Sequence, residues 1–151
     1  MNLEIVINND LKQAMLAKDT KKLNALRAIK AALLLEKTGK DIVSSEIPET
    51  VELKLLQKLV KQRKESAVIY TANNRHELAE EELYQASIIE AYLPKQLSDD
   101  DVRAIVTEII AETGANSIKD MGKVMGLASK KIAGQADNKT ISEIVKQLLN
   151  T

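Results

Sequence analysis

Residues 118–133 carry the arrangement of side chains that most strongly suggests a binding surface. If this segment is an α-helix of roughly 3.6 residues per turn, three lysines and two glycines fall within about a third of its circumference, opposite its apolar side. These residues are Lys119, Gly122, Lys123, Gly126 and Lys130. Each glycine inside a helix costs roughly 1 kcal/mol relative to alanine, so two on an exposed face indicate that another backbone approaches closely. A phosphodiester chain flanked by lysines fits that description.

Three occupants of this face stay open from the sequence. The first is a nucleic acid, for which Lys131, Lys139 and Lys146 would extend the basic surface. The second is the N-terminal half of the chain, packed against the glycines with solvated lysines at the rim. The third is a separate protein partner. Lysines spread over several helical turns are by themselves only a solvated face, so the hypothesis depends on the glycines.

Arg63 raises a different question, because it falls within an apolar arc of an expected helix over residues 48–73. The other members of this arc are Val51, Leu55, Leu56, Leu59, Ala67 and Tyr70. An unpaired charge is costly in such a place, so we predict a structural ion pair with a glutamate of the following helix, Glu82 or Glu90. The alternative is a functional anion-binding site.

The sequence shows no catalytic or metal-binding constellation. It has no Cys and a single His, His76, which excludes thiolate chemistry and nearly excludes a His-ligated metal. No nucleophile has a fixed spacing to His76. The run of Asp99, Asp100 and Asp101 opens an expected helix, where the helix dipole favours carboxylates and consecutive side chains point to different sides. We therefore expect no catalytic residue, no cofactor and no metal.

Amphipathic helices must position these residues. Apolar residues recur at helical spacing in segments 3–18, 21–37, 48–73, 76–92, 99–112, 118–133 and 138–150. No segment shows a convincing strand pattern, and no repeat of solenoid period is present. The sequence thus predicts an all-α fold.

Small and polar residues mark the ends of these segments. The expected helix stops are Gly39 in a left-handed conformation, Asn73 with Asn74, Gly114 and Gly134. Ser117 and Asp137 are the expected N-caps of the last two helices.

The best domain boundary is the segment 93–97. Pro94 cannot continue a helix, and Ser98 followed by Asp101 has the spacing of a new capping box. We predict an N-terminal unit of about four helices over residues 1–93 and a C-terminal three-helix bundle over residues 97–151.

Composition is that of a globular protein with an aliphatic core. Hydrophobic residues make up 44% of the chain, charged residues 29% and aromatic residues only 2%. The formal net charge of zero hides an uneven distribution: residues 1–75 carry 14 basic and 9 acidic side chains, residues 76–113 carry 2 and 10, and residues 114–151 carry 6 and 3. Local surfaces, rather than the overall charge, therefore indicate partners.

The N-terminal residues lack a basic region followed by a long apolar run. No window approaches the roughly 18 uninterrupted apolar residues of a membrane span. We therefore expect a soluble, cytoplasmic protein that does not enter a membrane.

Four separated runs resemble the GatB/YqeY family, in the order that the family shows. They are residues 61–66 (KQRKES), 92–97 (YLPKQL), 120–126 (DMGKVMG) and 144–149 (IVKQLL). The resemblance covers nearly the whole chain and is closest to the stand-alone, YqeY-like members. It implies a C-terminal domain similar to the tail of the GatB subunit of the glutamine-dependent aminoacyl-tRNA amidotransferase, a tail that touches the body of the tRNA.

The same resemblance limits the activity that can be expected. ATP binding and amide formation in the amidotransferase belong to a separate cradle domain, which this sequence does not contain. The family's link to carbon–nitrogen ligases with glutamine as amide donor therefore transfers by name only. We expect a non-catalytic module that binds tRNA, or a tRNA-charging or amidotransferase component. The alternative is a protein–protein adaptor whose lysine and glycine face packs between domains or on a partner.

Overall fold

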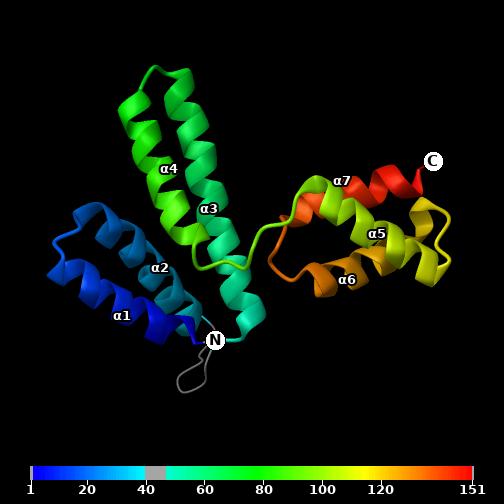
Figure 1. The fold of residues 1–151 in the computed structure, drawn as a ribbon, viewed down its shortest axis with the longest axis horizontal. Coiled ribbons are helices and arrows are strands. Elements are labelled where there is room, and N and C mark those ends of the chain that lie inside the picture. Colours follow the sequence, from blue (N-terminus) through cyan, green and yellow to red (C-terminus); the bar gives the residue numbers. More distant parts are fainter. Residues whose placement is uncertain (1, 40–46, 151) are drawn as a thin grey trace. The chain divides into compact units, whose positions relative to one another are not determined.

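The computed structural model describes residues 2–39 and 47–150. Over these residues the chain forms seven α-helices, one short 3-10 helix and no strand, which confirms the all-α prediction (Figure 1). The chain divides into two compact units, Met1–Leu93 and Pro94–Thr151. This division falls inside the segment 93–97, where Pro94 interrupts the helical pattern.

Two helical hairpins make up the N-terminal unit (Figure 1). The first joins α1 (Leu3–Leu16) to α2 (Thr20–Gly39), and the second joins α3 (Glu49–Ala72) to α4 (His76–Glu90). Aliphatic residues at helical spacing bring both hairpins onto one core. Its buried members are Leu3, Ile7, Leu11, Ala14, Leu23, Ala25, Leu26, Ile29, Leu33, Ile47, Leu56, Val60, Ala86 and Ile89.

The ends of α2 and α3 test two of the predicted helix stops. Asn73 caps α3, as predicted for this pair, and Asn74 adopts a left-handed φ of 58°. Gly39 is different: it is the last helical residue of α2 and its φ is not positive, so the left-handed stop expected there is wrong. The Thr38 hydroxyl donates to the carbonyls of Leu34 and Leu35 at 3.1 and 3.2 Å, which satisfies late carbonyls without a left-handed cap.

A buried carboxylate joins the two hairpins. Glu52, in the first turn of α3, is only 5% exposed, and its Oε2 accepts a hydrogen bond of 2.7 Å from the backbone N–H of Leu3. That N–H belongs to the first turn of α1, where no intrahelical acceptor exists and the helix dipole is positive. The bond fixes the start of α1 against the start of α3.

A second polar contact ties the end of α4 to α1. The Tyr92 hydroxyl donates to the Asp10 carboxylate, across 82 residues of sequence. Burial of the phenol, and then the adjacent Asp10 charge, raise the pKa of Tyr92 well above its ordinary value. The phenol therefore stays protonated and remains a hydrogen-bond donor over the whole neutral range.

Arg63 is half-buried between α3 and α4, but its partners differ from those predicted. Its Nε donates to Gln85 Oε1 and its guanidinium to the Leu59 carbonyl, both at 3.1 Å. Within the described residues it forms no ion pair with Glu82 or Glu90; Glu90 pairs with Lys64 instead, at 2.5 Å. The ion-pair prediction is therefore wrong: neutral acceptors satisfy the half-buried guanidinium, while its charge retains some contact with water.

Three helices make up the C-terminal unit. They are α5 (Asp99–Thr113), α6 (Met121–Ile132) and α7 (Asn138–Leu149), with a 3-10 turn, η1 (Ile118–Asp120), before α6. Their core is separate from that of the N-terminal unit and wholly aliphatic. Its buried members are Val102, Val106, Ile109, Val124, Ala128, Ile132, Ala136, Ile141, Ile144, Val145 and Leu149.

Helix caps of this unit follow the sequence pattern in most places. Ser98 and Asp101 form the predicted capping box, with hydrogen bonds of 3.1 and 3.3 Å between side chains and backbone amides. Gly114 ends α5 with a φ of 68°, and Asp137 caps α7 by accepting from the Lys139 amide at 3.4 Å. These polar contacts begin and end α5 and begin α7 close to the residues that the pattern predicts.

The helix expected over residues 118–133 begins differently. Residues Ile118–Asp120 form a 3-10 turn, and Ser117 makes no side-chain capping bond, so its assignment as the N-cap of α6 is wrong. Asp120 Oδ2 accepts from the Asn116 amide at 3.2 Å and closes this turn instead. At the other end, Ala133 and Gly134 are both left-handed, with φ of 35° and 81°.

We predict that a fragment of residues 95–151 folds by itself. Its aliphatic core lies entirely within the C-terminal unit, and its first residues are tied to the α6–α7 turn by a hydrogen bond of 2.8 Å from the Leu97 amide to the Gln135 carbonyl. Far-ultraviolet circular dichroism should show a helical spectrum and one cooperative urea transition. A random-coil spectrum would contradict the independence of this unit.

We also predict that Glu52→Ala lowers the free energy of unfolding by about 1.5 to 3 kcal/mol, because it removes a charged acceptor and leaves the Leu3 N–H without it. Glu52→Gln keeps an oxygen acceptor and should cost less. Glu49→Ala is the matched control, since Glu49 is exposed in the same first turn of α3. Equal midpoints for Glu52→Ala and Glu49→Ala in urea would disprove the role of this bond.

Candidate nucleic-acid interface

The exposed side of α6 and the turn before it contain most of the predicted binding residues. Val124, Ala128 and Ile132 are fully buried and fix the rotation of the helix. The opposite side is therefore in contact with solvent. The exposed residues there include Gly122, Lys123, Gly126, Leu127 and Lys130, with Lys119 exposed in the preceding turn.

The two glycines leave the backbone of α6 open. A Cβ atom added at Gly122 or at Gly126 would meet no atom within 4 Å. Neither residue has a positive φ, so the helix geometry itself does not require glycine at these positions. The backbone of α6 is therefore exposed over one turn, from Gly122 to Gly126, on the side where the two glycines lie.

The lysines fall into two groups. Lys119, Lys123 and Lys130 have no hydrogen-bond or ion-pair partner within the described parts of the chain, so their charges are available to a ligand. Lys131 instead reaches Glu108 of α5 at 3.4 Å, with both side chains about half exposed. Its charge is therefore turned away from the glycines.

Lys139 and Lys146 lie on α7 rather than α6. Both are exposed, and seven residues, or two helical turns, separate them, so they share one side of α7. They belong to the same compact unit as α6 and raise its positive charge.

The other polar residues singled out in the sequence do not form a site. His76 is exposed at the start of α4, and Asp99, Asp100 and Asp101 are exposed in the first turn of α5. In the described ranges, no three His, Asp or Glu side chains are grouped so that they could hold a metal ion. None of the helices seen is long and apolar enough to cross a membrane.

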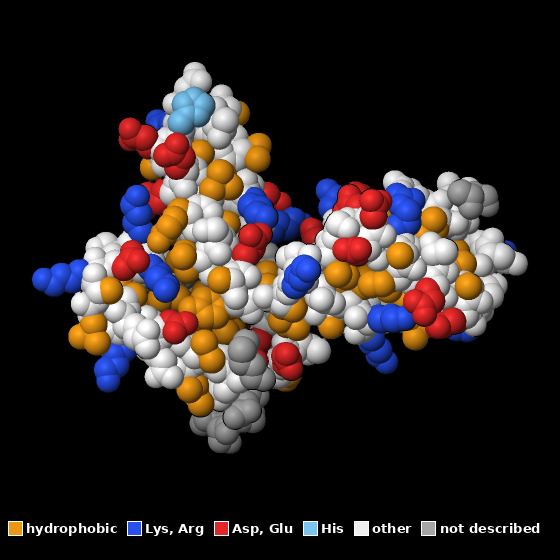
Figure 2. Space-filling view, in the orientation of Figure 1, with side chains coloured by type: hydrophobic (Ala, Val, Ile, Leu, Met, Phe, Trp, Pro, Cys, Tyr) orange, Lys and Arg blue, Asp and Glu red, His pale blue; other side chains and the backbone are white. Residues whose placement is uncertain are grey.

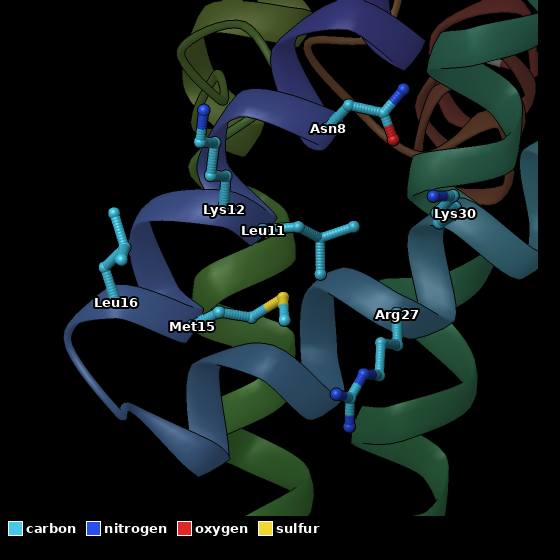
Figure 3. Close-up of a pocket in the computed structure, with 7 residues that line it drawn as sticks. All are labelled: Asn8, Leu11, Lys12, Met15, Leu16, Arg27 and Lys30. Carbon is cyan, nitrogen blue, oxygen red and sulfur yellow. The ribbon is translucent and has the colours of Figure 1, made fainter.

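A groove between α1 and α2 was missed by the sequence reasoning. It has a volume of about 810 Å³, and its walls combine Leu11, Met15 and Leu16 with three cations (Figure 3). The cations are Lys12, Arg27 and Lys30. Met15 belongs to the apolar helical pattern of residues 3–18, yet it is 60% exposed. The sequence signal that could have indicated this groove is the set of cations Lys12, Arg27 and Lys30 on the two helices.

Comparison with known proteins places the chain in a family. The family model of the Yqey-like protein matches residues 5–149. Altered inheritance of mitochondria protein 41, mitochondrial, from Meyerozyma guilliermondii is 32% identical over 149 residues, which cover 95% of this chain and 74% of the relative. The proteins of the same name from Vanderwaltozyma polyspora and Kluyveromyces lactis are each 30% identical, over 76% and 89% of this chain and 64% and 69% of their own lengths.

These relatives correct one expectation and establish the family. All three are named as mitochondrial proteins, which contradicts the cytoplasmic location expected from the sequence. That expectation rested on the lack of a secretory leader and of a membrane-spanning run, and neither observation excludes an organelle. Because the family model covers almost the entire described chain, this protein belongs to the family of Yqey-like proteins.

Proposed function

We propose that the C-terminal unit binds the phosphate backbone of tRNA along the exposed side of α6. The observation that carries this proposal is the open backbone at Gly122 and Gly126, flanked by Lys119, Lys123 and Lys130, whose charges have no partner in the described chain. Phosphate groups can approach a helix closely where side chains are absent, and lysine ammonium groups on either side neutralise them.

The composition of this unit favours a structured RNA over an unpaired strand. Residues 94–151 contain no Tyr, Phe or Trp, so no aromatic platform exists on which unstacked bases could lie. Lysines act as point charges and carry no base-specific geometry. The surface therefore suits the backbone of a folded RNA. The choice of tRNA among folded RNAs rests on the resemblance of this domain to the GatB tail.

A protein partner is the second candidate occupant. Leu127 is 41% exposed beside the lysines of α6, and Ile118 is 44% exposed in the turn before the helix. Apolar side chains at the edge of a basic face favour contact with a protein surface. A tRNA-charging or amidotransferase component is the partner that the family resemblance suggests, and the face would then serve an adaptor.

We predict that Lys123→Gln combined with Lys130→Gln weakens tRNA binding and flattens its dependence on salt. Each phosphate that the variant no longer neutralises should reduce the slope of log K against log salt by about one unit, because fewer counterions are released. Titration of labelled tRNA at several salt concentrations measures both quantities. Lys131→Gln is the matched control on the same helix, since Lys131 pairs with Glu108, and it should change the slope little.

Absence of tRNA binding by the unmodified protein at low salt would disprove the nucleic-acid proposal. A partner complex that is insensitive to salt and abolished by Leu127→Ser would support the adaptor instead, because burial of apolar surface does not release counterions.

We further predict that Gly126→Ala raises the free energy of unfolding by about 1 kcal/mol and that Gly122→Ala, in the first turn of α6, raises it by less, since the new methyl group meets no neighbouring atom. The same substitutions should weaken tRNA binding, because the methyl group holds the phosphate backbone away from the helix. Gly39→Ala is the control: this exposed helical glycine also has open space around it, and its replacement should leave tRNA affinity unchanged. Wild-type affinity in both α6 variants would show that the glycines do not contact the RNA.

A further inference from the structure

The groove between α1 and α2 exposes apolar and cationic groups side by side (Figure 3). Met15 is 60% exposed and Leu16 is 78% exposed, so two adjoining large apolar side chains are in contact with water. Lys12, Arg27 and Lys30 around them have no carboxylate partner within the described chain. A ligand that fits this groove must supply both apolar surface and negative charge.

The outer side of α4 has the complementary character. Glu77, Glu80 and Glu81 are exposed there and have no cationic partner in the described residues. Leu83 and Tyr84, which follow them on the helix, are 50% and 36% exposed. We name these five residues the acidic arc. Figure 2 shows acidic side chains gathered beside the pale-blue histidine, at the start of this helix.

The two surfaces match in length as well as in charge. The acidic arc runs from Glu77 to Tyr84, which is about 11 Å along a helix that rises roughly 1.5 Å per residue. The wall of the groove on α1 runs from Asn8 to Leu16, about 12 Å on the same basis. An amphipathic helix of two to three turns is therefore the natural occupant of the groove.

The acidic arc cannot enter the groove of its own molecule. α4 packs on the core through Ala86 and Ile89, which are buried, and the acidic arc lies on the solvent side of the same helix. None of its glutamates pairs with Lys12, Arg27 or Lys30 in the described chain. Within the described residues of the N-terminal unit, neither surface has a partner.

We propose that the groove of one molecule binds the acidic arc of a second copy of this chain. The contact is reciprocal in a closed pair, because each copy offers one groove and one acidic arc. An RNA backbone fits this groove less well than an amphipathic helix, because phosphates gain nothing from the exposed Met15 and Leu16. This inference concerns the N-terminal unit and is independent of the proposed role of α6.

Charge reversal tests the proposal without requiring any one ion pair. The groove variant carries Lys12→Glu, Arg27→Glu and Lys30→Glu, and the arc variant carries Glu77→Lys, Glu80→Lys and Glu81→Lys. A control variant carries Lys54→Glu, Lys58→Glu and Lys61→Glu, three exposed lysines of α3 outside this groove, with the same change in net charge as the groove variant. Circular dichroism verifies that each is folded, as expected for exposed substitutions.

Sedimentation velocity of the full chain over a range of concentrations then measures the dissociation constant of the dimer. The groove variant and the arc variant should each raise this constant by about tenfold or more, because like charges then face each other at both contacts. The control variant should dimerise like the unmodified chain. An equimolar mixture of the two defective variants should form a heterodimer, because one contact is then charge-swapped and the other is unmodified.

Restoration by mixing is the decisive result, since loss of a fold cannot produce it. The groove and arc variants carry opposite net charges, so the arc variant is also mixed with the control variant, which has the net charge of the groove variant and should associate more weakly. A chain that stays monomeric at every concentration would overturn the proposal. So would a mixture of the two variants that stays monomeric, or a control variant as defective as the groove variant.

Discussion

The buried carboxylate of Glu52 needs a hydrogen-bond donor in place of water, and this need sets the arrangement of the N-terminal unit. Glu52 is 5% exposed, and removing a charged carboxylate from water is costly unless hydrogen-bond donors replace the water. The N–H of Leu3 is such a donor, and the positive end of the α1 dipole adds to it. Because the bond spans 49 residues of sequence, it fixes the position of α1 along α3. Because only the short turn at Asp19 separates α1 from α2, the position of α2 is fixed as well.

Internal pairing explains which charges are left for a partner. Asp10 of α1 accepts a hydrogen bond from Tyr92, and within the described residues it forms no ion pair with the cations around the α1–α2 groove. On the other hairpin, Lys64 forms an ion pair with Glu90, while Arg63 donates to the neutral side-chain amide of Gln85 and to the Leu59 carbonyl. These contacts hold Asp10, Arg63 and Glu90 in fixed positions within the N-terminal unit. The fold leaves a basic groove on one hairpin and the acidic arc on the other.

The helices and the exposed face of α6 were predictable from the sequence because apolar periodicity determines them. Caps such as Ser98 and Gly114 were predictable because capping depends on residues close together in the sequence. The side-chain partners that join one helix to another could not be predicted from the sequence. The periodicity places Arg63 toward α4 correctly, yet it does not distinguish Gln85 from the glutamates within two turns of it. The burial of Glu52 could not be predicted from the sequence for a related reason. The helix dipole explains a glutamate in a first turn equally well, and only the approach of α1 makes it a buried acceptor.

The glycines of α6 show how the C-terminal unit can keep a binding surface at the expense of stability. Gly126 lies inside the helix and costs it about 1 kcal/mol relative to alanine, and Gly122 in the first turn costs less. Neither their φ angles nor any neighbouring atom in the described chain requires glycine at these positions. Such a helix is too short, at 12 residues, to be stable by propensity alone. Its stability comes from Val124, Ala128 and Ile132, which are fully buried against α5 and α7. The buried side can therefore hold the helix while the exposed side stays bare, and substitutions on that side can change binding without disturbing the core.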